Sequence, residues 1–235
     1  MNLILLHPED FISDHEIRIS GSRLAHIRKV LKINPGDCLS MGIVNGPMGK
    51  GKLIHREKEN DIFAISCTDS PPAPIPLTLV LALPRPKVFR RILQSVTALG
   101  VKHIILLHSF RVEKSYWQSP FLSPVSISEQ CTAGLQQAKD TIFPTIDMEP
   151  RFRPFVEDRL PLLTKKQKGY VAHPHNSPKL PTSPCTPAIL AIGPEGGFIP
   201  FELDLLSKAG MQPFSMGDRI LSVETAVSAF ISKFM

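Results

Sequence analysis

The sequence has few cysteines and no long hydrophobic segment. Its four cysteines, Cys38, Cys67, Cys131 and Cys185, are scattered without a close pair, which argues against zinc, iron–sulfur and thiol redox motifs. The longest strongly apolar run, residues 77–83, is far shorter than the roughly 20 residues that cross a bilayer. An apolar run at 3–6 has no basic residue before it, so we expect no signal peptide. We therefore expect a reduced, cytosolic and soluble protein with no membrane partner and no metal.

Several common nucleotide, hydrolase and metal motifs are also absent. No Gly-x-Gly-x-x-Gly follows an expected strand, and no Gly-x-Ser-x-Gly elbow is present. Residues 46–52 do satisfy Gly-x4-Gly-Lys, but Leu53 stands where a magnesium-binding Ser or Thr belongs and a strand is expected to follow, so we interpret 46–52 as a hairpin loop. We interpret His173-Pro174-His175 as a loop, because no third metal ligand lies nearby in the sequence.

The composition is that of a globular chain with a basic C-terminal part. The 235 residues are 43% hydrophobic, enough for one or two domains with their own cores. Lys and Arg number 27 against 21 Asp and Glu, a net charge of +6. The first 70 residues hold nine of each sign, so the whole excess lies in 71–235, and residues 85–114 hold seven basic residues and one acid. A field of this sign suits a polyanion such as nucleic acid, although a solvated helix face has the same composition.

Proline marks a domain boundary. Four of the six residues at 71–76 are proline, which predicts a linker between a domain at 1–70 and a domain at 77–235. The first part has short alternating segments separated by turn residues, which predict a small antiparallel barrel or sandwich with strands at 38–44, 51–55 and 62–67. One helix is expected at 23–32, before a turn at 34–37.

In the second part, strands and helices are expected to alternate, which predicts an α/β fold with a parallel sheet. The expected strands are 77–83, 103–108, 188–192 and 211–216, and the expected helices are 87–99, 126–139, 200–209 and 223–235. Helix 87–99 places Val88, Ile92, Val96 and Leu99 on one face and Lys87, Arg90, Arg91, Gln94 and Thr97 on the other. Ser126 and Glu129 have the spacing of a capping box.

Two loops at the carboxyl ends of strands carry candidate chemistry. Residues 193–198 contain three glycines, which let the backbone approach a ligand closely. Residues 217–225 hold Arg219 and Glu224 among apolar residues. Because ligands bind at the carboxyl ends of parallel strands, we expect the two loops to form one site. Each loop also has a simpler interpretation. Residues 193–198 could form a plain tight turn, and Arg219 and Glu224 could form a simple ion pair.

Both loops lie in segments that resemble one protein family. Ala-Ile-Gly-Pro-Glu-Gly-Gly-Phe at 191–198 and Met-Gly-Asp-Arg-Ile-Leu-Ser-Val-Glu-Thr-Ala at 216–226 resemble the ribosomal RNA small subunit methyltransferase E family. His-Ile-Arg-Lys-Val-Leu at 26–31, Pro-Gly-Asp at 35–37 and Leu-Gly-Val at 99–101 are similar to it as well. Members of that family methylate N3 of one uridine in 16S rRNA and belong to the SPOUT class.

The resemblance implies a fold, a cofactor and partners. It implies a PUA-like β-barrel at 1–70 that helps to hold RNA, followed at 77–235 by an α/β fold with a mostly parallel sheet and a C-terminal trefoil knot. It implies S-adenosyl-L-methionine as the cofactor, a homodimer, and 16S rRNA of the small ribosomal subunit as the substrate of a cytoplasmic enzyme.

The resemblance also assigns residues. The implied cofactor-binding residues are Ile192, Gly193, Glu195, Gly196, Gly197, Met216, Gly217, Ile220 and Leu221. Arg219 and Glu224 match the polar positions beside the reacting centre: Arg219 suits a cation that stabilises the uracil anion, and Glu224 is either a base or a group that orients Arg219. RNA binding is assigned to Arg23, Arg28, Lys29, Arg90 and Arg91.

Three departures from the family pattern bear on RNA placement more than on cofactor binding. Ser222 stands where the family usually has Arg. Residues 137–140, which end at Asp140, read Gln-Ala-Lys-Asp where the family often has Gln-Ser-Gly-Arg. Residues 95–100 read Ser-Val-Thr-Ala-Leu-Gly where the family usually has Lys-Ala-Thr-Glu-Leu-Gly. Two other hypotheses therefore stay open. The chain could be a non-catalytic RNA-binding or ribosome-assembly factor, or a methyltransferase of another RNA such as tRNA.

Overall fold

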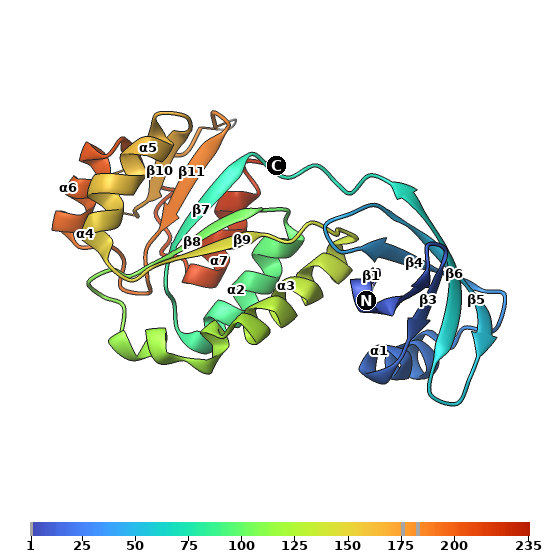
Figure 1. The fold of residues 1–235 in the computed structure, drawn as a ribbon. Coiled ribbons are helices and arrows are strands. Elements are labelled where there is room, and N and C mark those ends of the chain that lie inside the picture. The colour runs from blue at the N-terminus through green and yellow to red at the C-terminus, as the bar shows by residue number, and fades with distance from the viewer. Residues whose placement is uncertain (1, 175–176, 182–183) are drawn as a thin grey trace. The chain divides into compact units, whose positions relative to one another are not determined.

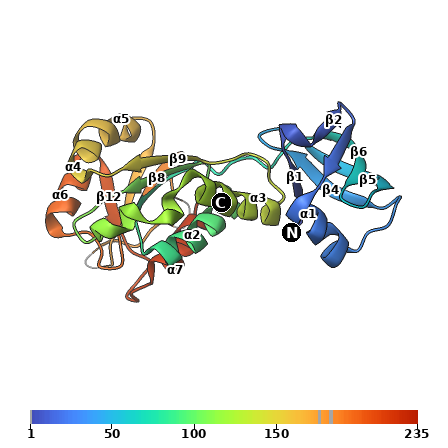
Figure 2. The same cartoon turned by 60° about the horizontal axis from the view of Figure 1, so that its bottom comes forward.

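The computed structural model describes residues 2–174, 177–181 and 184–235 (Figures 1 and 2). It divides into two compact units: one comprises the chain up to Pro72 together with Leu135–Phe143, and the other comprises Ala73–Gly134 and Pro144–Met235. The boundary falls in the proline-rich segment 71–76, which forms no helix or strand. Among the described residues, no helix is long and apolar enough to span a membrane. His175 of the expected His-Pro-His loop lies outside the described residues.

The first unit contains a mixed six-stranded sheet in the order β1-β4-β5-β6-β3-β2. The strands are β1 (Ile4–Leu6), β2 (Phe11–Ser13), β3 (Glu16–Ile19), β4 (Cys38–Ile43), β5 (Met48–Arg56) and β6 (Asp61–Asp69). The three strands expected from the sequence are confirmed as β4, β5 and β6, and the β4–β5 connection is a hairpin. β1 pairs with β4 in parallel, so the sheet is not purely antiparallel as expected. Ile17, Met41, Leu53 and Phe63 lie in its buried core.

The expected helix of the first unit is present but changes its winding. Helix α1 (Gly21–His26) continues as the π-helical segment η2 (Ile27–Leu31), which ends at Lys32 in the left-handed conformation. The turn expected at 34–37 closes through the Asn34 amide, which donates to Asp37 Oδ2 at 2.7 Å. A short 3-10 turn, η1 (Pro8–Asp10), precedes β2.

Leu135–Phe143 groups with the first unit, a departure from the expectation that 77–235 forms one domain. Leu135 is fully buried in a cluster with Leu3 and Leu5, onto which Phe143 also packs. Thr141 Oγ1 donates to the Gly46 carbonyl at 2.6 Å. Leu135–Phe143 therefore group with the first unit because their apolar side chains pack against residues of β1 and its neighbours.

The second unit contains a six-stranded sheet in the order β12-β10-β11-β7-β8-β9, and every pair is parallel as predicted. Its strands are β7 (Leu77–Ala82), β8 (His103–Leu107), β9 (Thr145–Glu149), β10 (Lys168–Ala172), β11 (Ala188–Ile192) and β12 (Met211–Phe214). β7 and β11 are adjacent, and every residue of both is buried. The chain builds β8 and β9 on one side of this pair and β10 and β12 on the other, so the sheet has a topological switch point at its centre.

The four helices expected at 87–99, 126–139, 200–209 and 223–235 are present as α2, α3, α6 and α7, whereas α4 and α5 were not expected. The α-helices are α2 (Pro86–Ala98), α3 (Pro124–Ala138), α4 (Phe152–Pro154), α5 (Leu160–Thr164), α6 (Pro200–Lys208) and α7 (Val223–Ile231). There are also two 3-10 segments, η3 (Lys114–Gln118) and η4 (Pro120–Leu122), and a π-helical segment, η5 (Phe155–Arg159). Figure 1 shows α2 and α7 on one side of the sheet and α4, α5 and α6 on the other.

Three details of the predicted helices are wrong. α3 begins at Pro124 instead of Ser126, because Ser123 Oγ accepts a hydrogen bond from the Ser126 amide at 3.3 Å. Thr97 of α2 is fully buried, since the helix packs a wider face than the expected stripe. α7 ends at Ile231 rather than 235.

Candidate functional site

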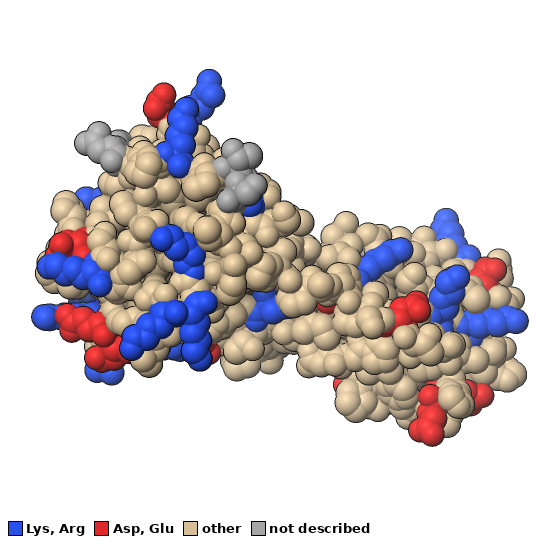
Figure 3. Space-filling model, turned by 90° about the horizontal axis from the view of Figure 1, so that it is seen from above, with Lys and Arg blue, Asp and Glu red and all other residues tan. Residues whose placement is uncertain are grey.

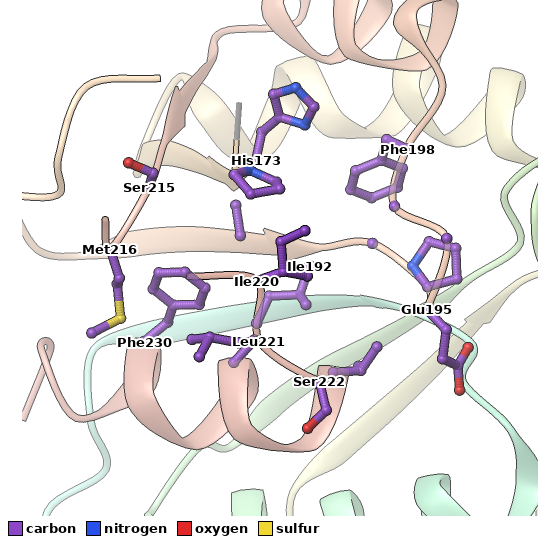
Figure 4. Close-up of a pocket in the computed structure, with 18 of the residues that line it drawn as sticks. His173, Ile192, Glu195, Phe198, Ser215, Met216, Ile220, Leu221, Ser222 and Phe230 are labelled. Carbon is purple, nitrogen blue, oxygen red and sulfur yellow. The ribbon is translucent and has the colours of Figure 1, made fainter. Parts of the chain in front are cut away.

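A cavity of about 380 Å³ lies at the carboxyl ends of β10, β11 and β12 (Figure 4). Three segments line it: residues 172–174 at the end of β10, 192–198 at the end of β11, and 215–217 with 219–223 after β12. Arg111 after β8 and two side chains of α7, Ala226 and Phe230, complete the wall. The volume lies in the usual range for small-molecule sites, and the two loops that the sequence predicted to form one site do so.

The glycine loop is shaped so that its backbone forms one wall of the cavity. A Cβ at position 193 would lie 3.1 Å from the Phe198 nitrogen and 3.2 Å from the Gly197 Cα, which is closer than ordinary van der Waals contact, so a side chain there would force the loop backbone to shift. The loop closes through the Gly197 amide, which donates to the Pro194 carbonyl at 2.8 Å, and Gly197 has a φ of +70°. The sequence motif is therefore required by the loop's own geometry.

The cavity has an apolar interior and polar groups at its margins. Figure 4 shows Ile192, Leu221 and Phe230 around its interior. His173 and Ser215 lie along one margin and Glu195 and Ser222 along another. This distribution matches a site for a ligand with a flat apolar part and polar ends.

The loop after β12 places Arg219 at the cavity, where its side chain makes no ion pair with another described residue. Arg219 is exposed, lines the cavity, and has no ion-pair partner within the described part of the chain. Gly217, with a φ of +123°, allows the turn that brings the loop back toward α7. Ser222, one of the departures from the family pattern, is the N-cap of α7: its Oγ accepts from the Thr225 amide at 3.3 Å.

Glu224 has a different partner from the one expected. Its carboxylate binds Arg91 of α2 in a two-point ion pair, with Arg91 Nε 2.9 Å from Oε1 and Nη2 2.8 Å from Oε2. The pair raises the pKa of Arg91, chiefly through the hydrogen bond. The expectation that Glu224 pairs with Arg219 is therefore wrong, since the carboxylate joins α7 to α2 and is not among the residues that line the cavity.

Two residues that the sequence did not single out hold the glycine loop in place. The Arg111 guanidinium donates to the Gly196 carbonyl. The buried Glu202 carboxylate accepts from the Ile199 amide at 3.0 Å and from the Phe110 amide at 2.7 Å, so it fastens the loop after β8 to the start of α6. An acidic residue in the first turn of a helix that begins with proline is the signal that could have pointed to Glu202.

Glu195 of the glycine loop is also held by a hydrogen bond. Its Oε1 accepts a hydrogen bond from the Arg85 amide, between β7 and α2, at 3.1 Å. The loop predicted to bind a ligand is thus held by α2, by the loop after β8 and by α6.

The arginines predicted to bind RNA in the first unit have structural partners. Arg23 makes a two-point ion pair with Asp10, which is buried, and the hydrogen bond to this carboxylate raises the pKa of Arg23. Arg28 donates to the buried Asp61 at 2.6 Å and to the carbonyls of residues 58 and 60 at 3.0 Å each. Both guanidinium groups stabilise this unit.

The other basic candidates are more accessible. Lys29, Arg90 and Arg91 are exposed, and the Arg90 guanidinium lies 4.8 Å from the centre of the Phe121 ring. On the face drawn in Figure 3, both basic and acidic side chains are scattered over each unit. Asp140, the other family departure, is buried in the first unit, where its Oδ1 accepts from the Ile142 amide at 2.9 Å.

Metal ligands do not gather in the described part of the chain, which contains no group of three His, Cys, Asp or Glu able to hold an ion. The four cysteines are free. Burial raises the pKa of the Cys131 thiol and of the Cys67 thiol, which keeps both in the unreactive protonated form.

Comparison with known proteins gives a consistent result. The model of a family described as RNA methyltransferase domain matches residues 71–235. Ribosomal RNA small subunit methyltransferase E of Treponema pallidum is 31% identical, and the match covers 97% of this chain and 88% of that protein. Ribosomal RNA small subunit methyltransferase E 1 of Borreliella burgdorferi is 25% identical over 97% of this chain and 95% of that protein.

Solved structures share the fold across both units. The crystal structure of ribosomal RNA small subunit methyltransferase E from Neisseria gonorrhoeae, bound to S-adenosyl methionine, superposes with a TM-score of 0.74 at 21% identity, covering 99% of this chain and 95% of that one. A probable rRNA-methyltransferase from Porphyromonas gingivalis gives a TM-score of 0.77 at 18% identity, covering 99% and 96%.

Proposed function

Because the chain belongs to the ribosomal RNA small subunit methyltransferase E family, within the RNA methyltransferase domain family, we propose that it transfers a methyl group from S-adenosyl-L-methionine to N3 of a uridine in 16S ribosomal RNA. The observation that carries this proposal is the cavity enclosed by the glycine loop and the Arg219 loop at the strand ends. The Treponema and Borreliella relatives are named for a ribosomal RNA methyltransferase, and the Neisseria relative was crystallised with this cofactor.

The residues around the cavity fit S-adenosyl-L-methionine. The backbone of the glycine loop, which lines the cavity, suits the polar edges of the cofactor, and the apolar side chains of the cavity suit its adenine ring. The residues that we propose to hold it are Ile192, Gly193, Glu195, Gly196, Gly197, Met216, Gly217, Ile220 and Leu221. When bound, the cofactor supplies a methyl group on a sulfonium, which already carries its own leaving group.

The protein's own contribution is alignment and charge stabilisation. Holding the two reactants in one cavity removes the entropic cost of bringing them together. Uridine N3 carries a proton at neutral pH, and its loss leaves a negative charge on the uracil. We assign Arg219 as the cation that stabilises this charge, because it lies at the cavity and its guanidinium is not committed to an acid among the described residues. Glu224 is a structural partner of Arg91 in this proposal rather than the base.

The finer features of the fold and assembly follow from the family. We propose that the cofactor-binding segment forms a trefoil knot, that the first unit is a PUA-like barrel that helps to hold RNA, and that two copies associate. Ile220 supports the last point, because this apolar side chain at the cavity is 77% exposed in a single copy and a second copy could cover it. A ribosomal substrate would put the enzyme in the cytoplasm.

Mass spectrometry of RNA from cells with and without the gene tests the function. We expect 3-methyluridine in small-subunit rRNA of the first cells only, restored by the wild-type gene but not by Gly193→Val. Identical rRNA in both strains would favour a non-catalytic assembly factor. Loss of the methyl group from tRNA alone would mean that the substrate is a different RNA.

A further inference from the structure

The loop that follows β8 combines aromatic and basic side chains. Residues 110–121 contain Phe110, Tyr116, Trp117 and Phe121, whereas aromatic residues make up 7% of the whole chain. Arg111 and Lys114 lie among them and are exposed. Aromatic rings interleaved with cations are typical of surfaces that bind unpaired nucleic acid, because rings stack on bases and cations contact phosphates.

Within this loop, Phe110 presents its ring to solvent from a fixed backbone. Its side chain is 76% exposed, while the neighbouring Ser109 and Val112 are buried. Its amide donates to the carboxylate of Glu202, which is itself only 3% exposed. The Val112 amide donates to the Ser109 carbonyl at 2.9 Å and closes the turn around the exposed residue. The ring is therefore held outward by its anchored neighbours.

Two other rings of this loop have partners, and Tyr116 is half-buried. Trp117 Nε1 donates to His108 Nδ1 at 2.9 Å, and the Phe121 ring lies under the Arg90 guanidinium. Among the described residues, Phe110 makes no comparable ring or cation contact. Its face is available to a ligand.

The position of Phe110 is coupled to the cavity. The next residue, Arg111, lines the cavity and donates to the Gly196 carbonyl of the glycine loop. Glu202, which holds the Phe110 amide, also holds the Ile199 amide at the end of that loop. Two independent contacts thus fix the aromatic residue beside the loop that we assign to the cofactor.

We propose that Phe110 is a stacking platform for a base of the unpaired RNA segment that carries the target uridine. This inference rests on the proposed function. N3 lies on the pairing edge of uracil, so its methylation requires an unpaired base, and an unpaired base has lost part of its stacking. An aromatic ring fixed beside the cavity replaces that stacking and leaves the pairing edge free for the reaction.

The basic sequence segment that contains Phe110 suits the RNA backbone. Arg85, Lys87, Arg90 and Lys114 are exposed in the segment that contains seven basic residues and a single acid, Glu113. These cations are placed in sequence on both sides of β8 and can contact phosphates of the segment whose base stacks on the ring.

Phe110→Ala tests the proposal, with Phe110→Tyr as the matched control that keeps a ring. With small ribosomal subunits from cells lacking the gene, we expect the KM for the subunit to rise about tenfold or more in the alanine variant and to stay near the wild-type value in the tyrosine variant. The affinity for S-adenosyl-L-methionine should not change in either. An unchanged KM in Phe110→Ala would overturn the proposal.

A fluorescence experiment decides the stacking separately from catalysis. Trp117 is the sole tryptophan of the chain, so Trp117→Phe combined with Phe110→Trp places one fluorophore at position 110. We expect small-subunit rRNA to quench it, whereas rRNA that binds without quenching would contradict stacking. If the tryptophan at position 110 is already shielded from solvent without RNA, and this shielding is lost on dilution, a second copy of the chain covers the ring. If the wild type transfers no methyl group, the proposed function fails, while quenching still reports on Phe110.

Discussion

Arg219 and Glu224 stand five positions apart in the sequence, yet they differ in what surrounds them. Arg219 lies at the cavity with no acid bound to it among the described residues, whereas the Glu224 carboxylate is occupied by Arg91. The first arrangement leaves a cation available to a reacting anion. The second fastens two helices, α2 and α7, through an ion pair on the surface.

This difference predicts different effects of two substitutions. Arg219→Ala should lower kcat by about 100-fold or more, the usual effect of removing one group that stabilises developing charge, while cofactor affinity stays close to wild type. Glu224→Gln should retain most of the activity, since it weakens an exposed ion pair outside the cavity. Methyl-transfer kinetics with small ribosomal subunits would measure both. A Glu224→Gln variant as inactive as Arg219→Ala would show that Glu224 takes part in catalysis.

Single residues of the site could be predicted where local sequence determines their role. The glycines at 193 and 197 are needed by the turn itself, and Arg219 follows a strand end where ligands bind. The role of Arg111 could not be predicted, because its partner Gly196 lies 85 residues away in the sequence. The position of Glu202 in the first turn of α6 signals its bond to Ile199, but not its bond to the Phe110 amide, 92 residues away. Only the folded chain brings these groups together.

At the scale of strands and helices, β8, β9 and η5 are joined by a charged network. Asp147 of β9 accepts from His103 Nε2 of β8 at 2.9 Å and from the Arg159 guanidinium, which also binds Glu149. Burial raises the pKa of Asp147, but the hydrogen bonds from His103 and Arg159 outweigh it, and the net pKa lies below the ordinary value.

The lowered pKa predicts how this network responds to acid. A carboxylate with a depressed pKa in the folded state stabilises the protein above its unfolded pKa of about 3.9, and this contribution is lost as the pH falls through the folded value. Asp147→Asn should therefore lower Tm at pH 7, and the gap to wild type should narrow below about pH 4. Thermal unfolding followed from pH 7 to pH 3 would measure it, and a gap independent of pH would contradict the assignment.

Elements with strong local signals were predicted and weaker ones were not. β7 and β11 are almost entirely apolar, and Gly100 and Gly210, both with positive φ, follow α2 and α6 directly after the ends predicted for those helices, 99 and 209. β9 and β10 escaped prediction because each mixes polar or glycine residues with few apolar ones. Their strand conformation comes from pairing with neighbours already in the sheet.

At the scale of the whole molecule, the proline segment separates the two units in the sequence, but the residues of α3 are divided between them. Its last residues and the loop that follows belong to the first unit, where Leu135 is fully buried. The proline boundary could be predicted from composition. The grouping of Leu135–Phe143 with an N-terminal sheet could not, because it depends on contacts between segments more than 100 residues apart.

Leu135→Ala should destabilise the first unit by about 2–5 kcal/mol, the usual cost of a cavity in a packed core. Hydrogen exchange should show faster exchange in β1 and β4, with little change in β7 and β11. Val125→Ala is the matched control, because Val125 lies on the same helix and is exposed. Equal protection of β1 and β4 in both variants would show that Leu135 is not part of this core.

Calorimetric titration of S-adenosyl-L-methionine into the purified chain tests the central claim most directly. We expect saturable binding at one site per chain. Gly193→Val should abolish the binding, because its Cβ would already lie 3.1–3.3 Å from the backbone of the same loop, and its branched side chain would force that loop out of shape. Gly36→Ala should leave it unchanged, since Gly36 also has a positive φ but lies in the first unit. An absence of binding heat at near-millimolar cofactor, with the wild-type chain folded, would contradict the account.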